Sequence, residues 1–491
     1  MRETIKITNG VARMPQWRLK EPVSFSLLEG EHIAIIGDNG SGKTKLADMI
    51  TGKHPMFPDQ IVYDFGEGGN KLVSDNIKYI TFRDSYGSYD SSYYLQQRWN
   101  QQEIDEETPT VGKLLEEAYH YSAEDTAERR AFQKHLYELF SMEHLLDKYI
   151  VLLSSGEMRK FQLAKMLFSE PKILIMDNPF IGLDEETREQ LENLLKILSE
   201  ERKLQIILIV TKAKDIPDFI THVWEMRDEK LLQKTKRSEY VTEEYPGSVL
   251  EQEKLTAIAT LPQKDNEYNT EKVAVMDNVS IKYGKRTILD RVNWTVLNGD
   301  HWALNGKNGA GKSTLLSLVC ADNPQSYACN ITLFDRKRGS GESIWEIKKH
   351  IGYVSPEMHR AYNKDIDCIK IVASGLNDSV GLYVKPTEKD YEACRFWMRI
   401  FGVEDLCDRT FLKISSGEQR LVLLARAFVK DPELLILDEP LHGLDEKNGK
   451  KVKEIIDAFC KRKNKTLIMV SHYKDEYPEC INKEITLKRN I

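Results

Sequence analysis

The pattern of apolar and polar positions predicts short buried strands that alternate with longer helices. Runs of four to six residues rich in branched apolar side chains are typical of strands buried on both faces of a sheet. Helical periodicity marks other stretches, such as 158–168 and 419–429. Strands that alternate with helices favour the α/β class, with a mostly parallel sheet. The predicted strands are 32–36, 172–176, 205–210, 301–305, 434–437 and 466–470.

The chain contains two copies of one domain. GDNGSGKT begins at Gly37, and GKNGAGKS begins 269 residues later. Three further pairs recur at a spacing of 261 residues: LSSGE with ISSGE, ILIMDNP with LLILDEP, and GLD with GLD. Several motifs repeated in one order indicate a tandem duplication. We expect a first domain at 1–232, a second domain at 271–491, and between them a polar linker at 233–270 that contains two prolines.

Two glycine-rich loops, each between a predicted strand and a predicted helix, have the composition of a P-loop that binds a nucleoside triphosphate. Glycines let the backbone wrap phosphates with its N–H groups inward, and the helix that follows adds its positive end. In such loops the lysine reaches the β- and γ-phosphates, and the last hydroxyl is a ligand of Mg²⁺. We therefore predict ATP and Mg²⁺ as ligands. The predicted nucleotide-binding residues are Gly37, Asn39, Gly40, Gly42, Lys43 and Thr44 in the first loop, and Gly306, Asn308, Gly309, Gly311, Lys312, Ser313 and Thr314 in the second.

An aspartate ends one buried strand of each copy. Asp177 follows ILIM and Asp438 follows LLIL, where a carboxylate supplies the second protein contact to Mg²⁺. Thr44, Asp177, Ser313 and Asp438 are therefore the predicted metal ligands. The next residue matters for hydrolysis, because a carboxylate there polarises the attacking water. The second copy has Glu439 at this position, whereas the first has Asn178, which cannot accept a proton.

Composition excludes several kinds of protein. The 491 residues are 41% hydrophobic and 30% charged, with a formal net charge of −7. A chain with this charge lacks the basic field that attracts nucleic acids nonspecifically. No apolar run approaches the ~20 residues that span a bilayer, and the first residues lack the layout of a secretory signal. We expect a cytoplasmic protein without a membrane span of its own and without a strong nucleic-acid signal.

Seven cysteines all lie in the C-terminal half of the chain. Their number is odd and no CxxC pair occurs, so the sequence indicates neither a disulfide framework nor a zinc knuckle. We interpret them as buried or incidental thiols in a reducing compartment. They are Cys320, Cys329, Cys368, Cys394, Cys407, Cys460 and Cys480.

A serine- and glycine-rich segment precedes a predicted helix in each copy. Hydroxyl and N–H groups at a helix N-terminus form an anion site, although an ordinary helix cap has the same composition. Each segment lies between the P-loop and the strand-end aspartate, with its glycine 21 residues before that aspartate. This order resembles the pattern of the ATP-binding cassette ATPases over nearly the full chain. The residues concerned are Ser154, Ser155 and Gly156 in the first copy, and Ser415, Ser416 and Gly417 in the second.

The resemblance implies two P-loop NTPase cassettes in tandem, each with a parallel sheet core and a helical subdomain. In this family two cassettes close head to tail, and each ATP lies between the P-loop of one cassette and the serine-glycine segment of the other. Hydrolysis of the bridging γ-phosphate releases the closed state. The linker length makes closure within one chain plausible. The implied composite sites are Lys312, Ser313, Asp438 and Glu439 with Ser154 and Gly156, and Lys43, Thr44, Asp177 and Asn178 with Ser415 and Gly417.

The two composite sites differ in their hydrolytic groups. In the family, a histidine after the next strand senses the γ-phosphate and holds the glutamate in place. His472 matches this position 34 residues after Asp438, whereas the first copy has Lys212. The predicted catalytic residues are therefore Glu439, His472 and Lys312. We hypothesise that the first site binds ATP stably while the second site turns over, because loss of a general base lowers the rate by ~10²–10⁴.

Three further positions follow from the resemblance. Tyr283, 23 residues before Gly306, matches the aromatic residue that stacks on adenine. The same spacing in the first copy gives Met14, and Trp17 nearby is either a substitute for that aromatic residue or a buried core residue. Arg83 and Glu357 stand where the family has a glutamine that contacts metal and water, so these contacts stay open.

Residues 313–355 and 434–445 resemble the ModF type of tandem cassette protein. That type is associated with molybdate uptake, and its members also carry a photorepair label. It implies an ATP-binding subunit at the inner face of the cell membrane that energises a separate permease. No residue indicates an oxyanion-binding or photochemical site. The alternative therefore stays open: a non-transport ATPase with a regulatory, translation-associated or DNA-repair role.

Overall fold

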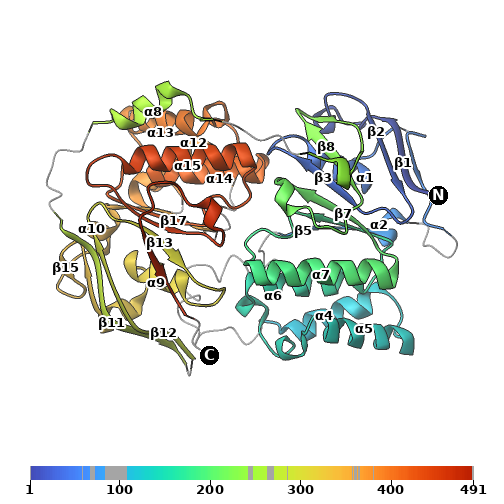
Figure 1. The fold of residues 1–491 in the computed structure, drawn as a ribbon, viewed down its shortest axis with the longest axis horizontal. Helices are drawn as coiled ribbons and strands as arrows, with labels where there is room; N and C mark the ends of the chain where they lie inside the picture. Colours follow the sequence, from blue (N-terminus) through green and yellow to red (C-terminus); the bar gives the residue numbers. More distant parts are fainter. Residues whose placement is uncertain are drawn as a thin grey trace. The chain divides into compact units, whose positions relative to one another are not determined.

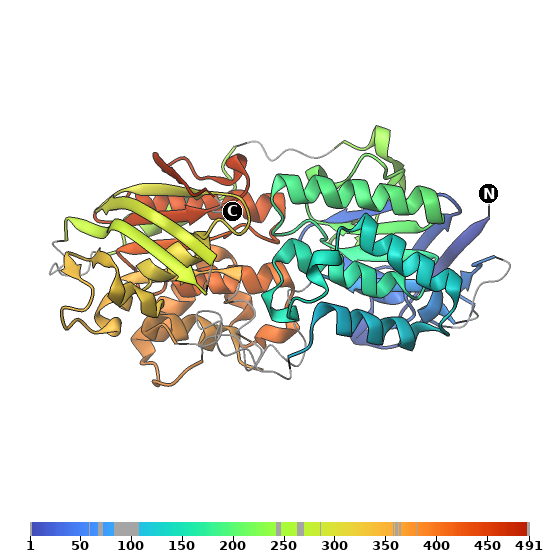
Figure 2. The ribbon, with the colours of Figure 1, turned by 90° about the horizontal axis from the view of Figure 1, so that it is seen from below.

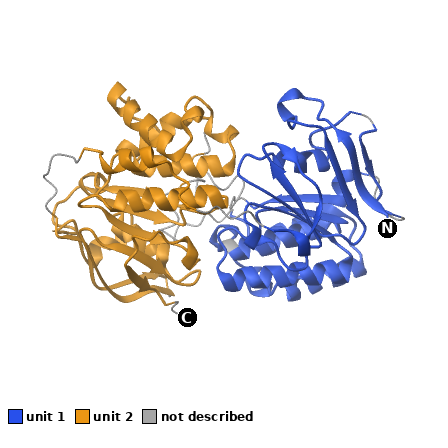
Figure 3. Ribbon diagram, turned by 45° about the horizontal axis from the view of Figure 1, so that its top comes forward, with its two compact units in different colours: residues 1–89, 105–244 blue, residues 90–104, 245–491 orange. Residues whose placement is uncertain are grey.

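The computed structural model describes residues 2–57, 59–66, 72–82, 108–241, 247–262, 270–284, 286–356, 358, 362, 365–379 and 381–488. Their contacts divide the chain into two compact units (Figure 3). Unit 1 holds the described residues of 1–89 and 105–244, and unit 2 holds those of 245–491. Each unit combines an antiparallel sheet, a mostly parallel sheet and a set of helices (Figure 1).

Unit 1 has two sheets. Its strands are β1 (Glu3–Gly10), β2 (Val23–Leu28), β3 (Ile33–Gly37), β4 (Ile61–Tyr63), β5 (Ile77–Thr81), β6 (Ile173–Asp177), β7 (Gln205–Val210), β8 (His222–Arg227), β9 (Lys230–Leu231) and β10 (Thr235–Lys236). The antiparallel sheet has the order β2-β1-β4, and the larger sheet has the order β10-β8-β3-β7-β6-β5, with β9 paired to β8. From β8 to β5 the neighbouring strands are parallel.

Helices cover the parallel sheet of unit 1 on both faces. They are α1 (Lys43–Ile50), α2 (Val73–Asn76), α4 (Val111–Ser122), α5 (Ala127–Leu139), α6 (Ser155–Leu167) and α7 (Glu185–Arg202). Ile33 and Ile35 of β3 pack into a core with α1 and the antiparallel sheet, whereas Ala34 and Ile36 pack into a second core with α4 to α7. Successive side chains of a strand point to opposite faces, so a strand buried on both faces is apolar at every position.

Unit 2 repeats this arrangement. Its strands are β11 (Lys272–Tyr283), β12 (Arg286–Leu297), β13 (His301–Asn305), β14 (Asn330–Leu333), β15 (Arg336–Lys337), β16 (Ile351–Val354), β17 (Leu434–Asp438), β18 (Thr466–Val470) and β19 (Lys483–Thr486). The antiparallel sheet has the order β12-β11-β14-β15. The parallel sheet has the order β16-β17-β18-β13-β19, which matches β5-β6-β7-β3-β8 of unit 1. The duplication in the sequence is thus a duplication of the fold.

The helices of unit 2 also lie on both faces of its parallel sheet (Figures 1 and 2). They are α8 (Gln252–Ala259), α9 (Lys312–Val319), α10 (Ile344–Lys348), α12 (Cys368–Ser374), α13 (Glu388–Phe401), α14 (Ser416–Phe428) and α15 (Glu446–Cys460). Leu434 and Ile436 of β17 face the core around α9, and Leu435 and Leu437 face the helical core. The predicted α/β class with mostly parallel sheets is confirmed.

The segment 233–270 is ordered where the structure describes it. Its first part forms β10, which pairs with β8 of unit 1. Its later part forms α8, which packs on α15 with Ile258 fully buried. The carboxylate of Glu454 on α15 also accepts hydrogen bonds from the backbone N–H groups of Val249 and Leu250. The parts of this segment therefore belong to different units.

No helix within the described ranges combines the length and the apolar character that a bilayer span requires.

Candidate active site

The two glycine-rich loops follow β3 and β13 and lead directly into α1 and α9. Gly42 and Gly311 precede the helices with φ of 94° and 93°, a left-handed conformation that favours glycine. A Cβ at Gly42 would approach the Leu19 side chain to 2.6 Å, and a Cβ at Gly311 would approach that of Leu289 to 2.8 Å. Because glycine has no side chain to cap a helix, the first N–H groups of α1 and α9 stay directed at their loops.

The lysine of each loop is buried against its own backbone. Lys43 Nζ donates to the carbonyl oxygens of Gly37 at 2.6 Å and Asp38 at 2.8 Å. Lys312 Nζ donates to the carbonyl oxygen of Gly306 at 2.6 Å. Each ammonium group is thus held against the backbone of its own loop, and a lysine together with loop N–H groups is the combination that a triphosphate needs.

In unit 1, a tyrosine joins the P-loop to the strand-end aspartate. The Tyr79 hydroxyl on β5 donates to Asp177 Oδ2 at 3.0 Å, and the same hydroxyl is hydrogen-bonded to the Thr44 side chain. Burial and the Asp177 carboxylate raise the pKa of Tyr79, so this hydroxyl keeps its proton. The two oxygen groups expected to hold Mg²⁺ in this cassette therefore share one neighbour, which the sequence did not indicate. Asn178 contributes no base, because its amide nitrogen donates to Asp177 Oδ1 at 2.8 Å.

In unit 2, two histidines hold the carboxylate of Glu439. His472 Nε2 lies 2.9 Å from Glu439 Oε1, and His442 Nδ1 lies 3.1 Å from Glu439 Oε2. The first contact follows from the sheet register, since Asp438 pairs with Val470 and His472 comes two residues later. The second contact was not predicted, although a histidine three residues after the glutamate was visible in LLILDEPLHGLD. Both carboxylate oxygens thus have an imidazole partner.

The environment of Glu439 keeps it ionised. Burial alone would raise the pKa of this carboxyl group, but hydrogen bonds and charge from His442 and His472 hold the pKa well below its usual range. Glu439 also has φ of 50°, and Asn178 has φ of 49°. Asparagine is common in this left-handed region, whereas glutamate there is strained, and strained residues cluster at functional sites.

A buried arginine fixes the turn that carries Glu439. Arg420 on α14 is 2% exposed. Its guanidinium donates to four backbone carbonyls, those of Ser355 at 3.2 Å, Asp438 at 3.0 Å, Pro440 at 3.2 Å and Glu439. In unit 1, Arg159 on α6 donates in the same way to the carbonyl of Ile181. The helix that begins at the serine-glycine segment is therefore tied to the strand-end turn of its own unit, which sequence spacing did not reveal.

The serine-glycine segments form the N-termini of α6 and α14. Ser154 and Ser415 are the cap residues, and each hydroxyl accepts from the N–H group of the glutamate three residues later, at 3.3 Å. The carboxylate of that glutamate in turn accepts a hydrogen bond from the serine N–H group at 2.7 Å, which completes a capping box in both units. Ser155 and Ser416 are the first helical residues, followed by Gly156 and Gly417. Within each unit, Ser154 and Ser415 therefore act as ordinary helix caps, one of the two interpretations that the sequence allowed.

The aromatic positions differ between the units. Tyr283 ends β11, is half-buried, and its hydroxyl accepts from Asn323 Nδ2 at 3.1 Å. In unit 1, His54 occupies the position that matches Asn323, 269 residues earlier, and its ring stacks on Trp17 at 4.1 Å. The interpretation of Trp17 as a core residue is wrong, because it lies half-buried on a short surface helix. Met14, the match by spacing, is 50% exposed.

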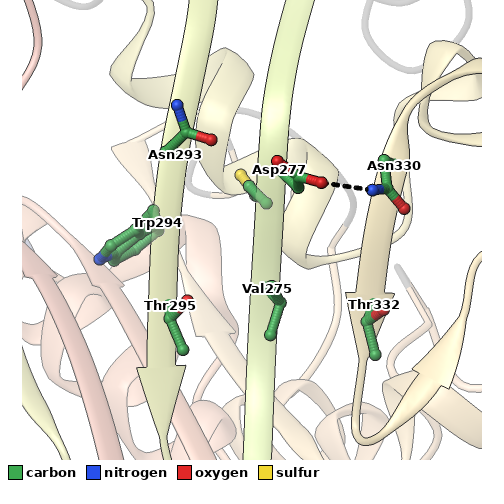
Figure 4. A pocket seen from close by; sticks show the side chains of 8 residues that line it. Val275, Asp277, Asn293, Trp294, Thr295, Asn330 and Thr332 are labelled. Carbon is green, nitrogen blue, oxygen red and sulfur yellow. Dashed lines mark hydrogen bonds between the residues drawn. The ribbon is translucent and has the colours of Figure 1, made fainter.

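Arg83 and Glu357 lie outside the described residues. Figure 4 shows a hollow on the antiparallel sheet β12-β11-β14, where Asp277 accepts a hydrogen bond from Asn330 at 2.7 Å. None of the candidate nucleotide-binding or catalytic residues lines this hollow.

Comparisons with known proteins agree with this geometry. The family model described as ABC transporter matches residues 20–181 and 289–442. The chain is 34% identical over 492 residues to the ABC transporter ATP-binding protein ModF of Escherichia coli, covering 97% of this chain and 95% of that protein. It is 31% identical to an uncharacterized ABC transporter ATP-binding protein of Schizosaccharomyces pombe, covering 98% and 97%.

A solved structure supports the fold of the whole chain. An archaeal ribosome recycling factor, aABCE1, in complex with the ribosomal stalk protein aP1, matches with a TM-score of 0.53 and 17% identity. The match covers 97% of this chain and 87% of the recycling factor. At this identity the likeness concerns the fold alone. With its two matches to the family model, the chain belongs to the ABC transporter family and is an ATPase built from two ATP-binding cassettes in tandem.

Proposed function

We propose that ATP is hydrolysed at the site of the second P-loop and is held without rapid hydrolysis at the site of the first. The observation that supports this division is the contrast between Glu439, a carboxylate held by two histidines, and Asn178, an amide that donates to Asp177. A carboxylate can take a proton from the attacking water and an amide cannot. We expect each site to be completed by the serine-glycine segment of the other cassette.

The proposed hydrolytic step uses groups of known position within unit 2. Lys312 would bind β- and γ-phosphate oxygens in place of the loop carbonyl that it now contacts. Glu439 would orient the attacking water and accept its proton, while His472 would donate to the γ-phosphate. Ser313 and Asp438 would hold Mg²⁺ through the oxygen ligands that this ion prefers, and the ion would supply positive charge to neutralise the phosphates. Tyr283 would stack on the adenine.

The proposed first site keeps the groups for binding. Lys43, Thr44 and Asp177 match their counterparts in unit 2, and the Tyr79 hydroxyl keeps the last two close together. Thr44 and Asp177 would hold Mg²⁺ here. The ring of Trp17, stacked on His54, is the aromatic surface of this cassette that best replaces Tyr283. Stable ATP at this site would keep the cassettes closed while the second site turns over.

We further propose that the chain is a cytoplasmic subunit that energises a separate membrane permease at the inner face of the membrane, with molybdate as the first candidate substrate. The likeness to ModF over nearly the full chain supports a transport role. The competing function is a non-transport ATPase that acts in regulation, translation or DNA repair.

Affinity capture of the tagged full chain from native membranes and from the soluble fraction of the same cells tests the transport role. We expect a permease with several membrane spans to copurify in stoichiometric amounts with the Glu439→Gln variant in the presence of ATP, because blocked hydrolysis prolongs the closed state. The variant without ATP is the control. Stoichiometric recovery of ribosomes or DNA enzymes without a permease would contradict the transport role.

A further inference from the structure

Three side chains of the kinds that bind metal ions lie together in unit 2. Among the residues that the structure describes, His301, Cys460 and Cys480 form such a group, with their ligand atoms within 4.8 Å of one another. They come from the first residue of β13, the last residue of α15 and the segment that leads into β19. The P-loop follows the other end of β13, four residues or about 13 Å along the strand. The cluster is therefore separate from the nucleotide site.

The spacing of the three donors is close to what one bound ion requires. Zinc binds cysteine sulfur at about 2.3 Å and histidine nitrogen at about 2.0 Å, so donors that share a tetrahedral ion lie about 3.3–3.8 Å apart. A separation of at most 4.8 Å closes to these values with shifts of about 1 Å. Cys460 is buried, whereas His301 and Cys480 are half-buried, which leaves a route from solvent.

The surroundings of His301 favour a cation. Its Nδ1 lies 3.1 Å from the carbonyl oxygen of Cys480, and its Nε2 lies 3.2 Å from that of Lys465. A neutral imidazole has one N–H group and one lone pair, so one of these carbonyls faces a lone pair. A metal ion that bound this nitrogen would displace the facing carbonyl oxygen from the lone-pair direction, because only 3.1–3.2 Å separates the two atoms, while the other N–H group would keep its carbonyl. Metal-bound histidines are commonly oriented by such a second hydrogen bond. The competing occupant of this nitrogen is a proton.

Unit 1 has the histidine without the sulfur atoms. His32 occupies the position that matches His301, while Ser199 and Phe219 match Cys460 and Cys480, 261 residues earlier. The His32 ring packs edge-on against Phe219 at 5.9 Å, and its Nδ1 accepts from the N–H group of Ile206 at 3.2 Å. The cysteine pair is therefore not required by the shared fold, because unit 1 forms the same fold with serine and phenylalanine at these two positions.

We propose that His301, Cys460 and Cys480 bind one zinc ion or a related thiophilic cation. Thiolate and imidazole together suit such ions, whereas the hard Mg²⁺ of the nucleotide sites prefers oxygen ligands. The bound ion links the end of α15 to β13 and to the segment before β19. This site does not depend on the proposed division of ATP hydrolysis.

Zinc titration of the chelator-treated, reduced full chain tests the proposal, with a chromophoric chelator as competitor. We expect one zinc ion per chain. The double variant Cys460→Ala/Cys480→Ala should bind zinc at least about 100-fold more weakly, since loss of outer-sphere partners alone lowers affinity 10–100-fold. His301→Phe, which places an apolar ring there, should also weaken binding. The matched control Cys329→Ala/Cys407→Ala removes two half-buried cysteines elsewhere and should bind like the wild type.

Alkylation of the wild type gives a measurement that does not depend on variants folding. Zinc should protect Cys460 and Cys480 from iodoacetamide, as mapped by mass spectrometry, and should leave Cys329 and Cys407 equally labelled with and without zinc. Equal zinc affinity in the wild type and the double variant, or the absence of protection at Cys460 and Cys480, overturns the proposal. Wild-type affinity in a folded His301→Phe variant overturns the role of the histidine and with it the three-ligand site.

Discussion

The Glu439→Gln substitution should lower the steady-state ATPase rate by about 10²- to 10⁴-fold, the factor that general-base catalysis contributes. Glutamine keeps the shape of the side chain but cannot accept a proton from water. Because Asn178 offers no carboxylate at the other site, the first cassette cannot compensate. Phosphate release by the purified full chain, measured at saturating Mg-ATP, gives this rate.

Glu433→Gln is the matched control for this variant. Glu433 precedes the same strand, β17, and its Oε2 lies 3.1 Å from His350 Nδ1, so the substitution removes a carboxylate beside a histidine at the other end of the strand. We expect its rate to stay within about twofold of the wild type, since this contact lies at the opposite end of β17 from Glu439 and touches no residue of the proposed site. A Glu439→Gln rate that matches the Glu433→Gln rate would show that Glu439 is not the base.

Substitution of the two histidines that contact Glu439 should lower kcat by different amounts. We expect His472→Ala to lower kcat by about 10²–10³, the effect of removing one donor to developing charge. His442→Leu should lower kcat by about 10-fold with little change in KM, because a hydrogen bond to a charged group contributes ~1.5 kcal/mol or more. The His442 ring contacts the carboxylate that would orient the water, so we expect His442 to act as a positioning residue.

A conservative substitution at His442 distinguishes a positioning role of this side chain from a general loss of stability. Asparagine at position 442 keeps a side-chain donor, so His442→Asn should recover part of the rate that His442→Leu loses. Thermal unfolding of both variants shows whether the fold is intact. Equal kcat values for His442→Leu and the wild type would mean that the contact with Glu439 Oε2 has no role in turnover.

The sheets could be predicted because their strands are buried on both faces. The core strands β7, β13 and β18 coincide with the predicted ranges, since each contains a run of adjacent apolar residues, three in β13, four in β18 and five in β7, that lacks the helical period. Helix starts were less accurate. Helix α6 begins at Ser155, whereas its predicted range begins at residue 158, because the first turn is specified by the capping box of Ser154 and Glu157 and not by burial.

Contacts within the site were predictable only where the strand register dictates them. The resemblance to the family implies that His472 lies beside Glu439, and the register of β17 and β18 accounts for this contact, since Asp438 pairs with Val470 and His472 comes two residues later. The contact with His442 depends on the left-handed turn at Glu439, and Arg420 reaches that turn from another helix. Tyr79 joins Thr44 to Asp177 through a neighbouring strand. No periodicity in the sequence encodes these three contacts.

The cluster of His301, Cys460 and Cys480 was also not predictable from the sequence. Cys460 and Cys480 are 20 residues apart and lack a CxxC spacing, so the sequence favoured incidental thiols. Their approach to His301 requires α15, β13 and the segment before β19 to pack together. For Trp17 the sequence left two interpretations open, an adenine-stacking substitute or a core residue, and the ring in fact lies half-buried and stacked on His54.

Counting bound nucleotides during turnover tests whether the first site retains ATP while the second site hydrolyses it. The full chain is incubated with Mg-ATP, separated rapidly from free nucleotide, and its bound ATP and ADP are quantified. We expect about one intact ATP per chain to persist through many turnovers, and Lys43→Ala to lose this retained ATP. Retention of ADP alone would contradict the proposal that the first site holds intact ATP. The proposal would also be contradicted if Lys43→Ala and Glu439→Ala lowered the ATPase rate equally while nucleotide stayed bound at each untouched site.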